Sequence, residues 1–240
     1  MTTKLYHQDS YQKEFSASVM DVKPEIHAVV LDQTAFFPGG GGQPPDRGSL
    51  EFNDLTLPVQ KLKADQGAVL HYLPPDSRLP PISAAVNGLL DWPRRYQLMR
   101  THTAMHILCG VIFRDYGASV TGGNMQPLQG RMDFEFTSLH KGLISEIEQS
   151  INREVEASRS VSWRVLPREE AFQIPDLIRT KINLLPPRIN QVRVVEIDGL
   201  DLQADGGTHV KNTSEVGGIM ITDYKSKGKD NKRIYLELLP

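Results

Sequence analysis

The sequence has little cysteine and no long apolar run. Its single cysteine among 240 residues is Cys109, which excludes a disulfide scaffold and a zinc site built from two or more cysteines. No stretch of 18 apolar residues occurs, and residues 1–15 lack the apolar segment of a signal peptide. We therefore expect a soluble, cytoplasmic protein.

A strong excess of positive charge is also absent. The chain has 27 Lys and Arg against 29 Asp and Glu, a net charge of -2. This balance disfavours a protein held to nucleic acid mainly by bulk positive charge, but it is compatible with a local basic patch. The length suits one large domain or two small ones.

The first part of the chain has short apolar runs separated by Gly and Pro clusters. This pattern predicts strands over residues 19–22 and 28–31, and weaker ones over residues 56–59 and 68–73. Many short strands with Gly and Pro turns favour a small barrel or sandwich. We predict a glycine-rich, β-barrel-like N-terminal domain over residues 1–88.

The character of the chain changes near Asp91, after which helical and strand patterns alternate. Helices are predicted over residues 93–116 and 138–158, with a third piece over about 167–174 that Pro175 should end. Strands are predicted over residues 131–136, 192–197, 218–224 and 233–239. We therefore predict an α+β fold overall, with an antiparallel sheet and long helices in a second domain over residues 89–240.

Two pairs of residues have metal-ligand chemistry. His102 and His106 lie four apart on a predicted helix, so both imidazoles can reach one ion. Asp205 and His209 lie four apart in the loop DGGTH. Alone, two histidines at this spacing are more often structural or surface residues than ligands, and the Asp-Gly-Gly loop alone is typical of an ordinary turn between strands. Together, three imidazoles and a carboxylate suit a first-row divalent ion such as zinc.

A glycine-rich stretch, FFPGGGGQPPDRG, covers residues 36–48. The backbone amides of four successive glycines could hold a phosphate. No Lys-Ser or Lys-Thr pair follows them, so the stretch is not a Walker A loop. On these residues alone, a flexible hairpin connection is favoured.

Three regions together carry a family resemblance: LDQTAFFPGGGGQPPDRG, RTHTAMHIL and DGGTHVKNTSEVGGI. They resemble the editing domain of alanyl-tRNA synthetase and its free-standing relatives, the AlaX trans-editing proteins of the medium-sized class. The regions occur in the family's order, at similar spacing, and span nearly the whole chain. The resemblance implies translation fidelity through hydrolysis of mischarged Ser-tRNA(Ala), with Gly-tRNA(Ala) as a second candidate. ATP, DNA and membranes are not implied as partners.

The sequence departs from the family pattern at Asp205. The family loop reads CGGTH, and its cysteine is a zinc ligand, whereas this chain has aspartate there. Carboxylates are legitimate zinc ligands. Three outcomes stay open: zinc bound by His102, His106, Asp205 and His209, a different divalent metal, or a weakened site. We favour zinc, as one ion.

The resemblance and the chemistry of a seryl substrate point to three catalytic candidates: Thr34, Gln43 and Thr103. A polar group that bonds the seryl hydroxyl would discriminate against alanine, which lacks it. We favour Thr34 as this sensor. Thr103 equally fits an ordinary helix hydroxyl bonded to its own backbone.

The tRNA requires cations near the site. The candidates are Arg94, Arg95 and Arg100 on the predicted helix, and Lys211 after the loop, with Lys181, Arg188 and Arg193 before it. The run YKSKGK over residues 224–229 is locally basic with one aromatic, and it fits either a solvated turn or a tRNA contact.

Two other functions remain open. The protein could be a deacylase for another mischarged tRNA, although the FFPGGGGQ stretch goes with the alanine family rather than with threonyl-type editing domains. Alternatively, it could be a tRNA-binding module whose metal site has degenerated, with Asp205 as the trace.

Overall fold

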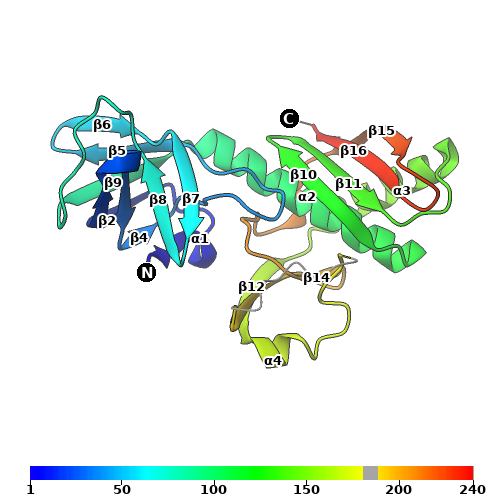
Figure 1. The fold of residues 1–240 in the computed structure, drawn as a ribbon. Helices are drawn as coiled ribbons and strands as arrows, with labels where there is room; N and C mark the ends of the chain where they lie inside the picture. Colours follow the sequence, from blue (N-terminus) through cyan, green and yellow to red (C-terminus); the bar gives the residue numbers. More distant parts are fainter. Residues whose placement is uncertain (181–188, 240) are drawn as a thin grey trace. The chain divides into compact units, whose positions relative to one another are not determined.

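The computed structural model describes residues 1–180 and 189–239. It divides into two compact units, Met1–Gln97 and Leu98–Pro240, and the division falls inside helix α2 (Trp92–Tyr116). Helices combine with antiparallel sheets, so the expected mixed α and β character is confirmed (Figure 1). Within the described ranges, no helix is long and apolar enough to cross a membrane.

The first unit is built mainly from strands, with one short helix and one 3-10 turn. Its elements are β1 (Thr3–Lys4), α1 (Leu5–Gln8), β2 (Glu14–Lys23), η1 (Pro24–Ile26), β3 (Ala28–Leu31), β4 (Gln33–Thr34), β5 (Gly48–Phe52), β6 (Leu55–Pro58), β7 (Lys61–Asp65), β8 (Ala68–Tyr72) and β9 (Ala85–Leu90). Seven strands form one sheet in the order β6-β5-β9-β2-β3-β8-β7.

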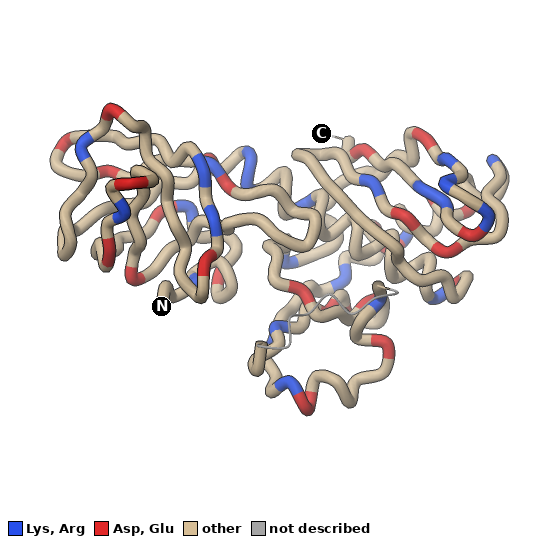
Figure 2. Tube along the Cα trace, viewed as in Figure 1, with Lys and Arg blue, Asp and Glu red and all other residues tan. Residues whose placement is uncertain are grey.

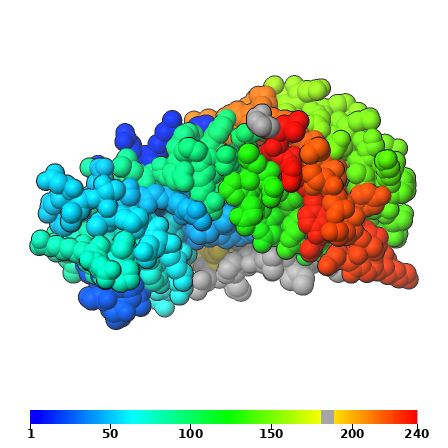
Figure 3. All heavy atoms as spheres, turned by 90° about the horizontal axis from the view of Figure 1, so that it is seen from above, coloured from blue at the N-terminus to red at the C-terminus, as the bar shows by residue number. Residues whose placement is uncertain are grey.

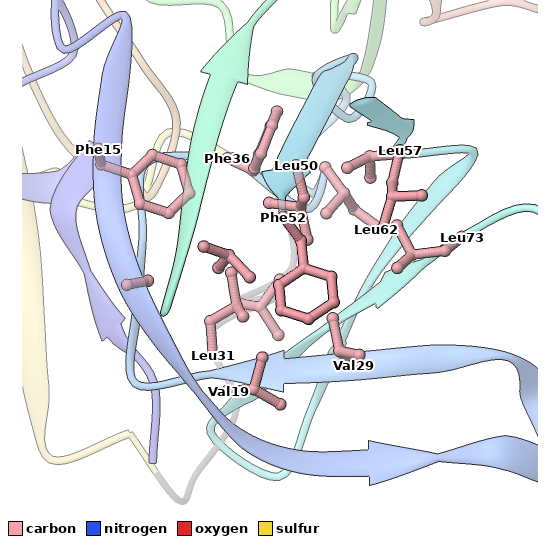
Figure 4. Close-up of a cluster of buried hydrophobic side chains, with 14 of the residues drawn as sticks. Phe15, Val19, Val29, Leu31, Phe36, Leu50, Phe52, Leu57, Leu62 and Leu73 are labelled. Carbon is pink, nitrogen blue, oxygen red and sulfur yellow. The ribbon is translucent and has the colours of Figure 1, made fainter. Parts of the chain in front are cut away.

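Strand β2 joins the two halves of this sheet, which are β6-β5-β9 on one side of it and β3-β8-β7 on the other. Its first part pairs with β9 and its last part with β3, and the register shifts between Val19 and Asp21. Such a bulge bends a strand and increases its twist. Alternate β2 residues Phe15, Ala17 and Val19 point into an apolar core shared by both halves (Figure 4). The sheet is therefore curved around one core.

The glycine-rich stretch forms a tight hairpin loop, with an antiparallel bridge between Gly40 and Gln43. Residues 39–42 all have positive φ angles, which only glycine adopts readily. Gly40 and Gln43 exchange two backbone hydrogen bonds of 3.0 Å. At the base of the loop, the Asp46 carboxylate accepts a hydrogen bond from the Phe37 amide at 2.6 Å. The chain therefore has a defined course here.

The second unit contains two antiparallel sheets and two long helices. After α2 come β10 (Val120–Gln126), β11 (Gln129–Phe134), α3 (Lys141–Glu156), β12 (Val161–Pro167), α4 (Arg168–Ala171), β13 (Gln191–Ile197), β14 (Asp201–Ala204), η2 (Thr213–Val216), β15 (Ile219–Ser226) and β16 (Lys232–Leu238). One sheet has the order β10-β11-β16-β15 and the other β12-β13-β14.

Helix α2 confirms the long helix predicted around the histidines. The Asp91 carboxylate accepts from the Arg94 amide at its start, and Gly117, with φ of 64°, ends it. Residues 101–112 of this helix are buried on every side. A helix buried all round lies in the interior of its unit.

Several shorter elements differ from the prediction. The third helical piece is only the four residues of α4. Strand β12 was not predicted, because most of its residues are exposed and give no alternating apolar pattern. Helix α3 confirms the second long helix and buries Ile144, Ile147, Ile151 and Val155.

Candidate metal centre

Four side chains that could hold a metal ion meet in the second unit. His102 and His106 come from the middle of α2, and Asp205 and His209 from the loop after β14. One ligand atom from each residue lies within 4.8 Å of all the others. The imidazoles are only 4–7% exposed. The structure thus brings together the four ligands expected from the sequence.

The helix and the loop orient the rings toward one another. Four residues make about one helical turn, and the His102 and His106 ring centres lie 5.1 Å apart. The His209 ring stacks on His102 at 4.3 Å and meets His106 edge-on at 4.7 Å. The three imidazoles therefore surround a common point.

The loop that carries Asp205 is held by Arg193 on β13. Its guanidinium donates hydrogen bonds to the carbonyl oxygens of Asp205 and Gly207 at 3.1 and 3.0 Å. The Asp205 carboxylate also accepts from the Gly207 amide at 2.7 Å. Arg193, which the sequence suggested as a tRNA contact, is only 8% exposed.

Two further side chains orient the imidazole rings by contacting their Nδ1 atoms. Asp201 Oδ2 lies 2.9 Å from His106 Nδ1 and accepts from Gln203 at 2.7 Å. Thr103 Oγ1 lies 3.1 Å from His209 Nδ1 and accepts from the Val210 amide at 3.3 Å. When these Nδ1 atoms carry the protons, the Nε2 atoms are left to bind metal.

Burial and neighbouring charges shift the pKa values of all four residues. Burial lowers the pKa of His102 well below its usual value and that of His209 to about 4. Burial alone would also lower the pKa of His106, but the hydrogen bond and charge of Asp201 outweigh it and raise that pKa. Burial opposes ionisation of Asp205, yet the adjacent His102 and His209 keep its pKa well below the usual value.

These residues fit a divalent ion. Neutral His102 and His209 offer lone pairs, and Asp205, whose side chain is 13% exposed, adds a negative charge. His209 Nε2 lies 3.0 Å from Asp205 Oδ2, and His102 Nε2 lies 3.6 Å from Asp205 Oδ1. The ligand types and their proximity are those of a metal centre.

Asp201 should control metal affinity although it is not a ligand. We expect Asp201→Ala to weaken zinc binding by about 10–100-fold, as loss of such a carboxylate typically does. Competition with a zinc-binding dye measures this. Asp198→Ala is the matched control, because Asp198 is exposed in the turn before β14. Equal affinities for the two variants would contradict this role.

The three catalytic candidates, Thr34, Gln43 and Thr103, are all buried. Thr34 is fully buried in the first unit, with its hydroxyl 2.9 Å from His71 Nε2. Gln43 is 2% exposed and closes the glycine loop through its backbone. Thr103 is buried on α2, where its hydroxyl contacts His209 as described above.

The expected tRNA contacts also differ in exposure. Lys211 is exposed, and Arg94 and Arg100 are partly buried. Arg100 donates to the carbonyl oxygens of Val216 and Leu239. Arg95 is 0% exposed and paired with Asp46, so its guanidinium presents no surface to solvent. Lys181 and Arg188 lie outside the described residues.

Known sequence families match both ends of the chain. The family described as "Threonyl and Alanyl tRNA synthetase second additional domain" matches residues 192–235, which contain the loop of Asp205 and His209. The family described as "tRNA synthetases class II (A)" matches residues 2–94.

Individual relatives match over much more of the chain. The chain is 40% identical to alanyl-tRNA editing protein AlaX-M of Saccharolobus solfataricus, with 100% of both chains covered. It is 37% identical to AlaX-M of Methanosarcina mazei, over 100% of this chain and 97% of the relative. It is also 38% identical to alanine–tRNA ligase of Thermococcus kodakarensis, over 92% of this chain but 24% of the ligase.

Proposed function

The chain belongs to the AlaX-M family of alanyl-tRNA editing proteins, and on that premise we propose that it hydrolyses Ser-tRNA(Ala) in trans. It is thus an aminoacyl-tRNA hydrolase that acts on a mischarged tRNA. Gly-tRNA(Ala) is the second proposed substrate. The observation that carries the proposal is the group of three buried imidazoles and one half-buried carboxylate, whose ligand atoms lie within 4.8 Å of one another.

We propose zinc as the ion, held by His102, His106, Asp205 and His209. Three nitrogen ligands and one carboxylate form a familiar zinc donor set. When bound, zinc supplies Lewis-acid chemistry for ester hydrolysis. The protein's own part is to orient the ligands: Asp201 holds His106, Thr103 holds His209, and Arg193 holds the loop of Asp205.

Because Asp205 stands where the family has a cysteine, the identity and amount of bound metal are measured directly. Protein purified without added metal should contain one zinc per chain, or take up one when zinc is added. Less than stoichiometric zinc that addition does not restore would contradict zinc as the ion. Parallel titrations with manganese and cobalt would then identify a harder or different divalent metal, which a carboxylate ligand also suits.

The substrate can be tested in one assay. The protein is incubated with Ser-, Gly-, Ala- and Thr-charged tRNAs, with and without a chelator. We expect loss of Ser-tRNA(Ala) that the chelator prevents, with Ala-tRNA(Ala) spared. Preferential loss of Thr-charged tRNA would instead indicate another deacylase. Binding of tRNA without any deacylation would indicate a binding module.

We further propose that Thr34 senses the seryl hydroxyl. Thr34→Val should slow hydrolysis of Ser-tRNA(Ala) roughly tenfold, the effect of losing one hydrogen bond of about 1.4 kcal/mol. Hydrolysis of Gly-tRNA(Ala), whose amino acid has no hydroxyl, should change much less. The two rates are measured side by side under single-turnover conditions.

The control for Thr34 separates sensing from folding. Thr34→Ser keeps a hydroxyl that can meet His71 and the Phe36 amide, as Thr34 does, so it should behave like the parent protein. If Thr34→Val slowed both substrates equally, the residue would act through the structure of its unit and the sensing role would be refuted.

We propose Arg94, Arg100 and Lys211 as tRNA contacts. Arg95 is assigned instead to holding the glycine loop, because it is buried against Asp46. With a net charge of -2, affinity for tRNA should be modest and should fall steeply with salt.

A further inference from the structure

We propose that the outward face of strands β11, β15 and β16, with the turn after β15, binds the phosphate backbone of tRNA. We call it the hairpin face and define it by Arg131, Lys225, Lys227, Lys229, Arg233 and Tyr235. Blue Lys and Arg segments lie over these strands in Figure 2, with red Asp and Glu segments between them. The inference rests on the proposed function, which supplies tRNA as the partner.

Strand register places the four strand residues of this face on one side of the sheet. Arg233 of β16 lies opposite Asp133 of β11 and opposite Lys225 of β15, and Arg131 lies opposite Tyr235. Residues paired across antiparallel strands point to the same face. The intervening residues are buried: Met132, Ile234 and Leu236. The cationic side chains therefore point away from the core.

The turn between β15 and β16 adds two cations, on a backbone that hydrogen bonds hold in place. The Lys227 amide donates to the Asn231 carbonyl at 2.8 Å. The buried Lys232 ammonium donates to the carbonyl oxygens of Gly228 and Lys229, both at 2.7 Å. Lys227 and Lys229 are exposed, and within the described ranges neither ammonium forms an ion pair. The turn thus displays two positive charges from an ordered backbone.

Acidic neighbours neutralise only part of the face. Arg233 pairs with Asp133 at 2.6 Å, and Lys225 pairs with Asp223 at 2.9 Å. Asp230 follows Lys229 in the turn, and Glu237 bonds Gln129. The two unpaired lysines at the turn are therefore the groups that a phosphate would meet first. On a chain of net charge -2, this is a local basic patch.

An aromatic ring lies among the cations. Lys225 Nζ lies 5.1 Å and Arg233 Cζ 5.9 Å from the centre of the Tyr235 ring. Both distances lie within the range of cation–π attraction. Cations interleaved with an aromatic are typical of nucleic-acid surfaces. The orange and red atoms of β15 and β16 lie on the molecular surface beside green β10 and β11 in Figure 3.

The test removes the two turn lysines together, as Lys227→Ala with Lys229→Ala. The matched control is Lys61→Ala with Lys63→Ala, which removes two exposed lysines two residues apart on β7. Lys61 also lies 5.3 Å from a tyrosine ring, that of Tyr72. Circular dichroism confirms that both proteins are folded before binding is measured.

Affinity for uncharged tRNA(Ala) is measured at salt concentrations from about 50 to about 200 mM. The dependence of affinity on salt over such a range reports the number of phosphate contacts. We expect the Lys227/Lys229 variant to bind tRNA roughly tenfold more weakly at low salt. The slope of log binding constant against log salt concentration should become shallower by about 1 per lysine removed. In multiple-turnover deacylation, KM should rise more than kcat falls. The control should match the parent protein.

The outcomes separate this inference from the proposed function. If the variant kept the parent's affinity, salt slope and KM, the hairpin face would be refuted while deacylation stood. If the parent bound tRNA but hydrolysed no charged tRNA, and the variant still lost affinity and slope, the hairpin face would be supported and the proposed function refuted.

Discussion

Replacing Asp46 with alanine is expected to lower the free energy of unfolding of the first unit by about 3–5 kcal/mol, the cost of breaking a buried ion pair from one side. Arg95 is 0% exposed and its Nε donates to both Asp46 oxygens, at 2.9 and 3.1 Å. Without the carboxylate, the guanidinium would keep its charge in an interior that cannot hydrate it.

The loss should be large because Arg95 joins several segments. Its guanidinium also donates to the carbonyl oxygens of Ser10 and Ala35, at 3.0 and 2.5 Å. Asp46 in turn accepts from the Phe37 amide at the base of the glycine loop. One ion pair therefore holds the N-terminal segment, the glycine loop and the start of α2 together.

Tryptophan fluorescence during urea unfolding measures this effect. The chain has two tryptophans, so a Trp163→Phe background leaves Trp92 as the reporter for the first unit. Asp21→Ala is the control, since the Asp21–Lys23 pair is exposed and should leave the midpoint unchanged. Asp46→Ala combined with Arg95→Met should recover part of the loss. No change in the midpoint for Asp46→Ala alone would show that the pair does not stabilise the unit.

Replacing His106 with alanine is expected to lower deacylation of Ser-tRNA(Ala) by more than about 100-fold, because removing a ligand should exceed the 10–100-fold loss typical of its outer partners. The variant loses one of four donors and leaves the Asp201 carboxylate buried beside an empty space. Removing metal from the parent protein with a chelator should have the same effect.

Two control variants test whether the loss follows from ligation. His140→Ala removes an exposed histidine that caps α3, far along the chain from the cluster, and should keep full activity. Asp205→Cys keeps four ligands and should keep both zinc and activity. Single-turnover rates and zinc content are measured on the same preparations. Activity of His106→Ala or chelator-treated protein near the parent's would exclude a role for the metal in the reaction.

The residues of the candidate metal centre were predictable because each pair is local in sequence. The spacing of His102 and His106 matches a helical turn, and Asp205 and His209 share one loop. That two such pairs meet is a long-range fact, which the family resemblance supplied and the spacing could not. Asp201 and Gln203 were missed because they lie on β14, a four-residue strand without an alternating apolar pattern.

The arginines show why charge type alone is a poor guide to exposure. Arg95 looked like a surface cation, but its partner Asp46 lies 49 residues earlier. Arg193 similarly donates to carbonyl oxygens of a loop more than ten residues later. Such partners become neighbours only when the chain folds, so nothing near these arginines in the sequence distinguishes them from solvent-facing ones.

The glycine loop has a consequence for handedness. The φ angles of residues 39–42 are 88°, 145°, 59° and 91°. D amino acids adopt positive φ angles readily, whereas L amino acids rarely do. Around Gly40 even an added Cβ would find open space, so chirality rather than crowding demands glycine there. In stereochemical terms, the loop is a run of four positive φ angles, which the one achiral amino acid adopts at the least cost.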